Sequence, residues 1–549
     1  MPGGTIGSRP AFDAATVQRH HRSGAWDATT VADHVRRNAV RNPRGWAFRA
    51  PDRSLTWREY DEFSTRLAGA FVELGLPRGA VLGVLLTGGS LVHVVYLAAQ
   101  KAGAVTLGMG PRAGDQEVAR LLDRTSCGWL LTRPEHRGRD AGALRDSVRE
   151  RGSRVDRHVL ADLDEHGLHL RLNGVPAPLP GLERAESLIA GRALGADELF
   201  FLNSTSGTTG LSKCVTATMN TRKYFGALAT EAAELAPDDV FLSVLPAPYG
   251  FGLWSAHFVP AMLGATTVLC ADFDAPEAIG LIERERVTVL AAVTSQFIMM
   301  LNSPALAAAD LTSLRVLFTG GEPVRAEHAA EFEHRAGATV LQFYGSNEAG
   351  PLSVTRLADP PGKRLDTVGR PIAGQHIRLF DADGNDVTAN GGPGQCAGRG
   401  PGITPGYYRD DAANAELFRA DGWLLTGDLA TIDESGYLTV AGRTADLIIR
   451  GGQNISAIEV EAEVAGHPRV AQVAALGVPD PVLGERVCAV VVTRDGADLD
   501  VAELRAYLTD RGVSKHCWPE RVVLRQELPL GTGGKLDKQR LRAELSQDR

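Results

Sequence analysis

The sequence repeats a strand–helix–strand order, and this order restricts the fold more than any other feature. An apolar run at 81–86 predicts a strand, residues 91–101 predict an apolar helix, and residues 103–107 predict a second strand. Strands that are joined through a helix run parallel, and parallel sheets carry helices on their faces. Residues 118–132 repeat this pattern of secondary structure. We therefore predict a layered α/β fold.

The character of the sequence changes after Pro360. Short β-like pieces alternate with turns over about 360–442, which predicts a small β-rich subdomain. Beyond it, residues 443–549 alternate predicted helices and strands, and their number suits a small independent domain. We therefore expect a large N-terminal domain over 1–442, built of layered α/β subdomains, and a small mobile C-terminal α+β domain over 443–549.

Composition and charge exclude several classes of protein. A hydrophobic content of 44% with 23% charged residues is ordinary for a globular enzyme, and a net charge of -8 argues against a nucleic-acid or anionic-membrane binder. No apolar run approaches the ~18 residues that a membrane span needs. The six cysteines are scattered without a CxxC pair, so neither structural zinc nor a disulfide framework is expected. The N-terminus lacks a signal-peptide pattern, and we expect a cytoplasmic protein.

A loop rich in glycine and hydroxyl side chains follows a short apolar strand at 199–202. The loop reads Ser-Gly-Thr-Thr-Gly-Leu-Ser-Lys over 206–213. Glycine lets the backbone approach a ligand closely, and successive amides can form a positive nest to which Lys213 adds a mobile charge. The spacing differs from the common P-loop of NTPases. A polyphosphate is the simplest ligand, and its predicted contacts are Ser206, Gly207, Thr208, Thr209 and Gly210.

Three later strands also end in loops that contain glycine. The strand at 241–245 leads to Tyr249-Gly250-Phe251, the strand at 315–318 leads to Gly320-Gly321-Glu322, and the strand at 339–343 leads to Tyr344-Gly345-Ser346-Asn347-Glu348. Ligands of open α/β sheets bind beyond the carboxyl ends of the strands. We therefore expect these loops to share one site with the 206–213 loop.

The motif order resembles the adenylate-forming superfamily of acyl-CoA synthetases, aryl-acid ligases, peptide-synthetase adenylation domains and luciferases. Residues 206–213 reproduce the family loop Ser-Gly-Thr-Thr-Gly-x-x-Lys without a mismatch. The remaining motifs follow in the family order: Tyr344 to Glu348, Pro405-Gly406-Tyr407-Tyr408, Thr426-Gly427-Asp428, Gly442-Arg443, Gly451 to Ile455, and Gly533-Gly534-Lys535. The resemblance covers about 26–545, and acyl-CoA synthetases and aryl-acid ligases resemble the chain most.

The resemblance implies ATP and Mg²⁺ as cofactors and gives a role to each matching residue. Tyr344 would stack on adenine, Asp428 would bind both ribose hydroxyls, and Arg443 would assist near the ribose and phosphates. Glu348 would hold Mg²⁺, with Thr208 beside it, because Mg²⁺ prefers oxygen ligands. Further nucleotide contacts would come from Gly321, Glu322, Phe343, Gly345 and Asn347.

Catalysis in the resembling family depends on placed cations. Lys535 would bridge the substrate carboxylate and the α-phosphate, and Lys213 would bind the phosphates, because two anions repel unless cations stand between them. A second step would transfer the acyl group to a thiol after the C-terminal domain turns on a hinge at Ala445. Three residues depart from the family: Asn347 stands where Thr is usual, Cys214 where Gly is usual, and Ala445 where a polar residue is usual. The last departure puts efficient thioester formation in question.

The residues expected around the acid predict its class. Amino-acid-activating relatives have Asp, and dihydroxybenzoate ligases Asn, at the position of Gly250. The expected pocket of Tyr249, Gly250, Phe251, Gly320 and Gly345 is apolar and roomy. We therefore predict an aryl, alicyclic or fatty-type acid without an α-amino group.

The sequence thus predicts a ligase that forms an acyl-adenylate, releases pyrophosphate and passes the acyl group to coenzyme A, in natural product or lipid metabolism. The alternatives are an acid–AMP ligase that serves the phosphopantetheine thiol of an acyl or peptidyl carrier protein, and an enzyme that only adenylates. A luciferase-like oxygenase and a non-catalytic relative are further alternatives, and intact Lys213, Glu348, Asp428 and Lys535 argue against the latter.

Overall fold

The computed structural model describes residues 12–205, 213–322, 324–443, 447–450, 453–480, 484–494, 496–511, 513, 515–530 and 536–547. The chain divides into two compact units, of which the first comprises 1–377 with 398–424 and the second 378–397 with 425–549. Within the described ranges, no helix combines the length and the apolar character that crossing a bilayer would require.

The first unit contains an eight-stranded sheet whose middle strands run parallel. In sheet order the strands are β10 (Val175–Pro176), β9 (Gly167–Leu172), β8 (Arg157–Asp164), β5 (Trp129–Thr132), β3 (Val81–Leu85), β4 (Val105–Gly108), β11 (Leu199–Thr205) and β12 (Lys213–Thr218). β3 and β4 pair in parallel, as the strand–helix–strand pattern predicted, and β11 pairs in parallel with β4. Between β5 and α6 the chain forms a small antiparallel hairpin of β6 (Glu135–His136) and β7 (Arg139–Asp140).

A nine-stranded sheet forms the other half of the first unit. In sheet order its strands are β19 (Arg370–Pro371), β18 (Gly350–Val354), β17 (Thr339–Ser346), β16 (Val316–Gly320), β15 (Val289–Ala291), β13 (Val240–Ser243), β14 (Thr266–Leu269), β1 (Trp46–Arg49) and β2 (Leu55–Thr56). The run from β17 to β1 is parallel throughout. The carboxyl ends of β13, β16 and β17 therefore lie along one edge of this sheet.

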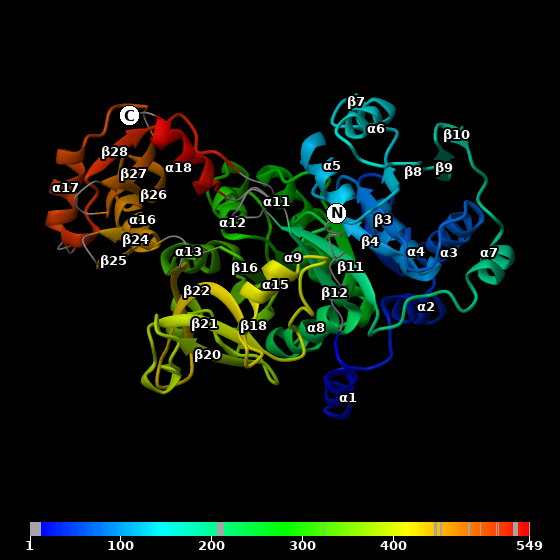
Figure 1. Ribbon diagram of the computed structural model, residues 1–549, viewed down its shortest axis with the longest axis horizontal. Helices are drawn as coiled ribbons and strands as arrows, with labels where there is room; N and C mark the ends of the chain where they lie inside the picture. The colour runs from blue at the N-terminus through cyan, green and yellow to red at the C-terminus, as the bar shows by residue number, and fades with distance from the viewer. Residues whose placement is uncertain are drawn as a thin grey trace, which may run out of the picture. The chain divides into compact units, whose positions relative to one another are not determined.

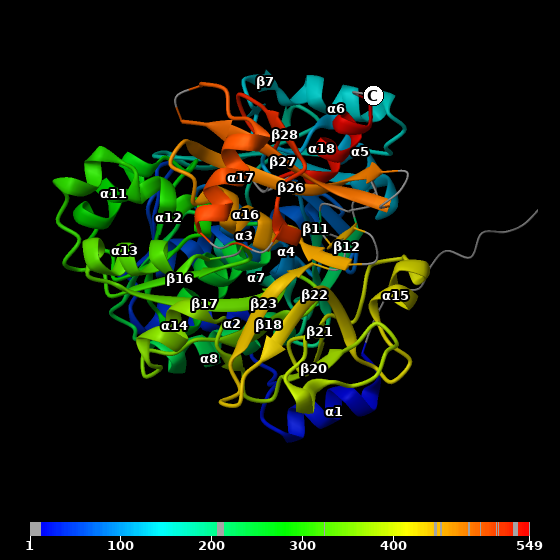
Figure 2. The same ribbon diagram turned by 90° about the vertical axis from the view of Figure 1, so that its left-hand side faces the viewer.

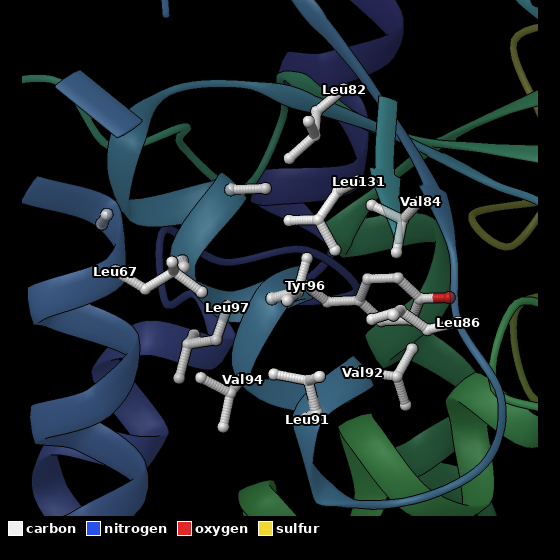
Figure 3. Packing of buried hydrophobic residues seen from close by; sticks show 14 of the residues in the cluster. Leu67, Leu82, Val84, Leu86, Leu91, Val92, Val94, Tyr96, Leu97 and Leu131 are labelled. Carbon is white, nitrogen blue, oxygen red and sulfur yellow. The ribbon is translucent and has the colours of Figure 1, made fainter. Parts of the chain in front are cut away.

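Helices cover both sheets. One core cluster joins the two sheets through α3 and α4, and Figure 3 shows Leu67 of α3 beside Leu97 of α4, and Leu82 of β3 beside Leu131 of β5. A second cluster packs α11, α12 and α13 on one face of the nine-stranded sheet (Figure 2), and α8 packs on its other face. The helices with their bounds are α1 (Ala14–Arg22), α2 (Val31–Arg41), α3 (Trp57–Glu73), α4 (Ser90–Ala102), α5 (Asp115–Arg124), α6 (Ala141–Glu150), α7 (Leu182–Ile189), α8 (Met219–Ala233), α9 (Gly250–Leu253), α10 (Val259–Leu263), α11 (Ala275–Arg284), α12 (Thr294–Leu301), α13 (Ala326–Ala336), α14 (Pro361–Asp366) and α15 (Asp411–Leu417), with a π-helical turn η1 (Trp254–Phe258) and a 3₁₀ turn η2 (Pro304–Ala307). The predicted layered α/β fold is confirmed.

Local sequence signals set the helix starts that matter for the site. Thr56 and Glu59 form a capping box at the start of α3. Thr218 caps α8 in the same way, with Thr221 three residues on. Because Thr218 is also the last residue of β12, the first turn of α8 follows the strand without a linker, and Arg222 lies in that turn.

The second unit contains a five-stranded sheet and most of a four-stranded one (Figure 1). The four-stranded sheet is formed by β20 (His376–Phe380), β21 (Gly394–Arg399), β22 (Leu424–Ile432) and β23 (Leu438–Arg443), with the short turn η3 (Thr388–Asn390). The other sheet is formed by β25 (Gln453–Ser456), β24 (Leu447–Arg450), β27 (Gly484–Thr493), β26 (Val470–Asp480) and β28 (Arg521–Leu524), with α16 (Ala457–Ala465), α17 (Val501–Asp510), η5 (Lys515–Cys517) and α18 (Lys538–Gln547). The predicted domain boundary at 442/443 stays a prediction, and it differs from this division into units. The second unit includes both β22 and β23, which pair with each other through a ladder that reaches from Asp428 to Arg443.

Candidate active site

The flanks of the glycine-rich loop are fixed by strand pairing. Thr205 at the end of β11 and Lys213 at the start of β12 are register partners in an antiparallel ladder. The chain therefore enters and leaves the loop at neighbouring points of the sheet. The loop residues Ser206, Gly207, Thr208, Thr209 and Gly210 lie outside the described residues, so their contacts with phosphate stay predictions.

Tyr407 links the loop lysine to the expected metal ligand. The Lys213 Nζ lies 4.9 Å from the centre of the Tyr407 ring, and the Tyr407 hydroxyl donates a 2.9 Å hydrogen bond to Glu348 Oε1. Burial, with a contribution from the negative charge of Glu348, raises the pKa of Tyr407, so the hydroxyl stays a donor. Sequence reasoning quoted Tyr407 in a matching motif but gave it no role. The structure makes it the connection between three signature segments.

Backbone contacts hold Glu348 in place from both sides. Its N–H donates to Ser346 Oγ over 3.2 Å, and its carbonyl accepts from the Thr404 N–H over 2.8 Å. Thr404 lies in the same stretch as Tyr407, so one segment fixes both the backbone and the carboxylate of Glu348. A carboxylate that is held in this way needs little reordering when a ligand arrives.

We expect Tyr407→Phe to weaken catalysis moderately and folding very little. Phenylalanine keeps the ring beside Lys213 and removes only the hydrogen bond to Glu348. One such bond contributes about 1 kcal/mol, or roughly fivefold in rate. Acid-dependent ATP–pyrophosphate exchange at several Mg²⁺ concentrations measures it. Unchanged exchange at limiting Mg²⁺, with an unchanged melting temperature, would show that Tyr407 does not position Glu348.

Gly250 and Asn347 meet at the carboxyl edge of the nine-stranded sheet. The Gly250 N–H donates to Asn347 Oδ1 over 3.2 Å, and a Cβ added at Gly250 would lie 2.6 Å from that oxygen. No real Cβ makes such a contact, so the amide of Asn347 occupies the space that a side chain at position 250 would need. The sequence predicted open, apolar space here, and the structure fills part of it with a polar group.

Arg222 stands beside this pair, and sequence reasoning did not name it. Its Nη2 donates to Asn203 Oδ1 and to the Asn347 carbonyl, each over 3.0 Å. Its Nη1 lies 3.7 Å from the position of a Cβ at Gly250. A single arginine in a helix carries no motif signal, so only the fold could reveal it.

Aromatic side chains form the apolar part of the pocket. Phe251 and Phe343 meet edge to face at 4.7 Å, and Trp254 packs against both. Gly320 makes room for this arrangement, because a Cβ there would lie 2.5 Å from the Phe343 carbonyl oxygen. Tyr249 is half-buried, and burial raises its pKa to about 12. The structure thus gathers Phe251, Gly320 and Phe343, three of the residues predicted for the site.

The other predicted nucleotide contacts lie at the ends of β16 and β17. Tyr344 and Gly345 belong to β17, and Gly321 follows β16 with a φ of 78°, which favours glycine. The Glu322 carboxylate accepts a 2.9 Å hydrogen bond from the Ser295 N–H at the start of α12. Their roles toward a nucleotide stay predictions.

The remaining predicted residues belong to the second unit. Asp428 in β22 and Arg443 in β23 are register partners, so the two positions expected near the ribose oppose each other across one ladder. Asp428 is buried and its N–H donates to Thr426 Oγ1 over 3.2 Å. The hinge residue Ala445 and the lysine Lys535 lie outside the described residues.

Comparison with known proteins gives matches over nearly the whole chain. Residues 35–408 match a family described as AMP-binding enzyme, and residues 459–535 match the AMP-binding enzyme C-terminal domain. A 2-hydroxy-7-methoxy-5-methyl-1-naphthoate–CoA ligase from Streptomyces carzinostaticus is 33% identical, over 96% of this chain and 95% of that protein. A salicyl-AMP ligase / salicyl-S-ArCP synthetase from Mycobacterium tuberculosis is 31% identical, over 99% and 96%. The structure of ATP-bound MatB from Rhodopseudomonas palustris has a TM-score of 0.80 at 27% identity, over 94% of this chain and 99% of that one.

Proposed function

The chain belongs to the AMP-binding enzyme family, and on this basis we propose that it activates an aryl, alicyclic or fatty-type acid that has no α-amino group. The reaction class follows from membership in the family: the enzyme is an ATP-dependent, AMP-forming acid–thiol ligase. Such enzymes use ATP with Mg²⁺ and pass the acyl group from an acyl-adenylate to coenzyme A or to a phosphopantetheine thiol. The identity of the acid and the choice of thiol belong to the proposal.

Adenylation sets the electrostatic problem that the site must solve. A carboxylate oxygen of the acid attacks the α-phosphorus of ATP, and the bond between that phosphorus and the bridging oxygen breaks to release pyrophosphate. Both reactants are anionic, so their approach is unfavourable until fixed positive charges stand near the reacting atoms. Catalysis then consists mostly of positioning and charge stabilisation.

The residues around Glu348 fit a magnesium–phosphate site. Glu348 supplies a carboxylate whose Oε1 accepts a bond from Tyr407, while its Oε2 accepts none from the described residues. Oxygen ligands of this kind suit Mg²⁺, which would neutralise charge on the phosphates. Lys213, across the Tyr407 ring, would bind the phosphate chain. The contact of Lys213, Tyr407 and Glu348 is the single observation that carries the assignment of the site.

The remaining roles continue the same logic. Tyr344 would stack on the adenine, and Asp428 would accept hydrogen bonds from the ribose hydroxyls, which suits a carboxylate with two acceptor oxygens. Lys535 would stand between the carboxylate and the α-phosphate. Phe251, Phe343 and Trp254 would enclose the apolar body of the acid.

A panel of acids should separate the substrate classes. We expect acid-dependent ATP–pyrophosphate exchange with aryl, alicyclic or fatty-type acids and background exchange with the corresponding α-amino acids. Phe251→Ala should raise KM for apolar acids by roughly tenfold, since it removes an aromatic wall. Exchange that amino acids trigger and non-amino acids do not would overturn the proposed substrate class.

The thiol acceptor needs a separate measurement. The names of the relatives include both a CoA ligase and a salicyl-S-ArCP synthetase, so similarity leaves two acceptors to compare. We favour coenzyme A, and an acyl or peptidyl carrier protein is the alternative. The adenylate should be offered free coenzyme A and a phosphopantetheinylated carrier protein in parallel. Thioester with the carrier alone would establish the alternative, and release of adenylate without either thioester would indicate an enzyme that only adenylates.

A further inference from the structure

Arg222 is a half-buried arginine whose Nε is fully buried, and it forms no ion pair with a carboxylate of the described residues. It lies in the first turn of α8, whose start is fixed by the Thr218 cap. No Asp or Glu oxygen among the described residues lies within 4.0 Å of it, although many other arginines of the first unit form such pairs. Its hydrogen bonds go to two neutral acceptors, Asn203 Oδ1 and the Asn347 carbonyl. The negative charge of Glu348 stabilises the cation without forming an ion pair with it, so the guanidinium still lacks a directly bonded anion among the described residues.

Two of its nitrogens keep donors that the described protein does not use. Arg222 Nε is buried and has no hydrogen-bond partner. Nη1 has no acceptor among the described residues and faces the space beside Gly250, 3.7 Å from where a Cβ would stand. Burial lowers the pKa of Arg222 to about 10, which leaves it charged at neutral pH. A buried donor without an acceptor indicates a missing partner.

The unused donors lie beside the pocket expected to hold the acid. Gly250 precedes Phe251, whose ring meets Phe343 in the aromatic wall. Gly250 also bonds to the Asn347 amide, so a guanidinium and an amide stand together at the edge of an apolar enclosure. One polar corner in an apolar pocket is the usual way in which a site orients a substrate.

We propose that Arg222 is a specificity-determining residue that binds a second oxygen substituent of the acid, a hydroxyl or a carboxylate next to the carboxyl that is activated. This inference rests on the proposed function. The planar guanidinium matches a carboxylate with two parallel hydrogen bonds, and a hydroxyl can accept one. The same charge would repel a substrate ammonium, which agrees with an acid that lacks an α-amino group.

The wild-type enzyme gives the first test. ATP–pyrophosphate exchange is measured with benzoate, 2-hydroxybenzoate and benzene-1,2-dicarboxylate, with their cyclohexane counterparts, and with hexanoate and 2-hydroxyhexanoate. At least one oxygen-substituted acid should exceed its unsubstituted parent by roughly tenfold or more in kcat/KM. Comparing the hydroxy acids with the dicarboxylates shows whether Arg222 binds a hydroxyl or a carboxylate. If the parents are activated and no substituted acid is preferred, the inference is wrong while the proposed function stands. Failure of every acid refutes the function itself.

Variants of Arg222 give the second test. Arg222→Leu should remove the preference for the substituted acid and leave activity on the parent acid within about threefold. Arg222→Lys should keep part of the preference, because lysine keeps the positive charge but lacks the planar pair of donors of a guanidinium. Arg184→Leu, which removes an arginine exposed at 65%, is the matched control and should change neither.

Two outcomes of the variant experiment would also overturn the proposal. An equal loss on parent and substituted acids would mean that Arg222 acts on the reacting carboxylate or on the fold. A rise in KM for ATP that is the same with every acid would mean that it acts on the nucleotide. If Arg222→Leu does not fold, the wild-type comparison and Arg222→Lys still decide the question.

Discussion

Lys535→Ala is expected to reduce acid-dependent ATP–pyrophosphate exchange by about 10²–10³-fold, because it would remove the cation that we propose stands between the two reacting anions. The proposed role of Lys535 follows from its place in the Gly533-Gly534-Lys535 motif, and residues 531–535 lie outside the described structure. The loss should appear in kcat rather than in KM for ATP, since the contact forms with the reacting groups.

Lys515→Ala provides the matched control for that experiment. Lys515 is an exposed lysine of the same C-terminal region, and its ring contact with Trp518 lies away from any motif. It should retain full exchange. The second half-reaction, measured by supplying preformed acyl-adenylate and thiol, should be much less affected in Lys535→Ala. Unchanged adenylation in Lys535→Ala would refute the role of this lysine.

Glu348→Gln is expected to lower kcat/KM for MgATP by about 100-fold, with partial recovery at high Mg²⁺. Glutamine keeps the shape of the side chain and can still accept a bond from Tyr407, so the change isolates the loss of negative charge. The backbone bonds of Glu348 to Ser346 and Thr404 remain, and the melting temperature should barely change.

The informative measurement is a Mg²⁺ titration of exchange at saturating acid. Glu231→Gln serves as the control, since Glu231 is 66% exposed and, within the described ranges, forms its one ion pair with Arg356 at the surface. A Mg²⁺ dependence identical to that of the wild type in Glu348→Gln would remove Glu348 from the metal site. A melting temperature lowered by many degrees would indicate a structural role instead.

The pattern of the sequence predicted local elements well. The strand expected at 81–86 is found as β3 (Val81–Leu85), and the helix expected at 91–101 is found as α4 (Ser90–Ala102). Both depend on neighbours within a few residues. The order of the strands in the sheets could not be predicted in this way. β1 pairs with β14 more than two hundred residues later, and nothing in the local sequence marks that pairing.

The same distinction holds for the site. Motif spacing was enough to name Lys213, Glu348 and Asp428 as candidate site residues, since each lies in a short motif whose residue types indicate its chemistry. It gave no role to Tyr407 and did not name Arg222. Tyr407 reaches Glu348 across 59 residues, and Arg222 reaches Asn347 across 125. Such contacts exist only after β12, β17 and the segment after β21 have been brought together.

The sequence by itself determined the reaction class, because binding a polyphosphate and a ribose requires particular residue types at fixed local spacings. The tertiary structure decided what surrounds the acid. Gly250 suggested empty, apolar space, yet the folded chain sets the amide of Asn347 and the guanidinium of Arg222 beside it. The physical reason is that the polarity of a pocket is a sum over side chains from distant segments. Only the packing of strands and helices fixes which of them share it.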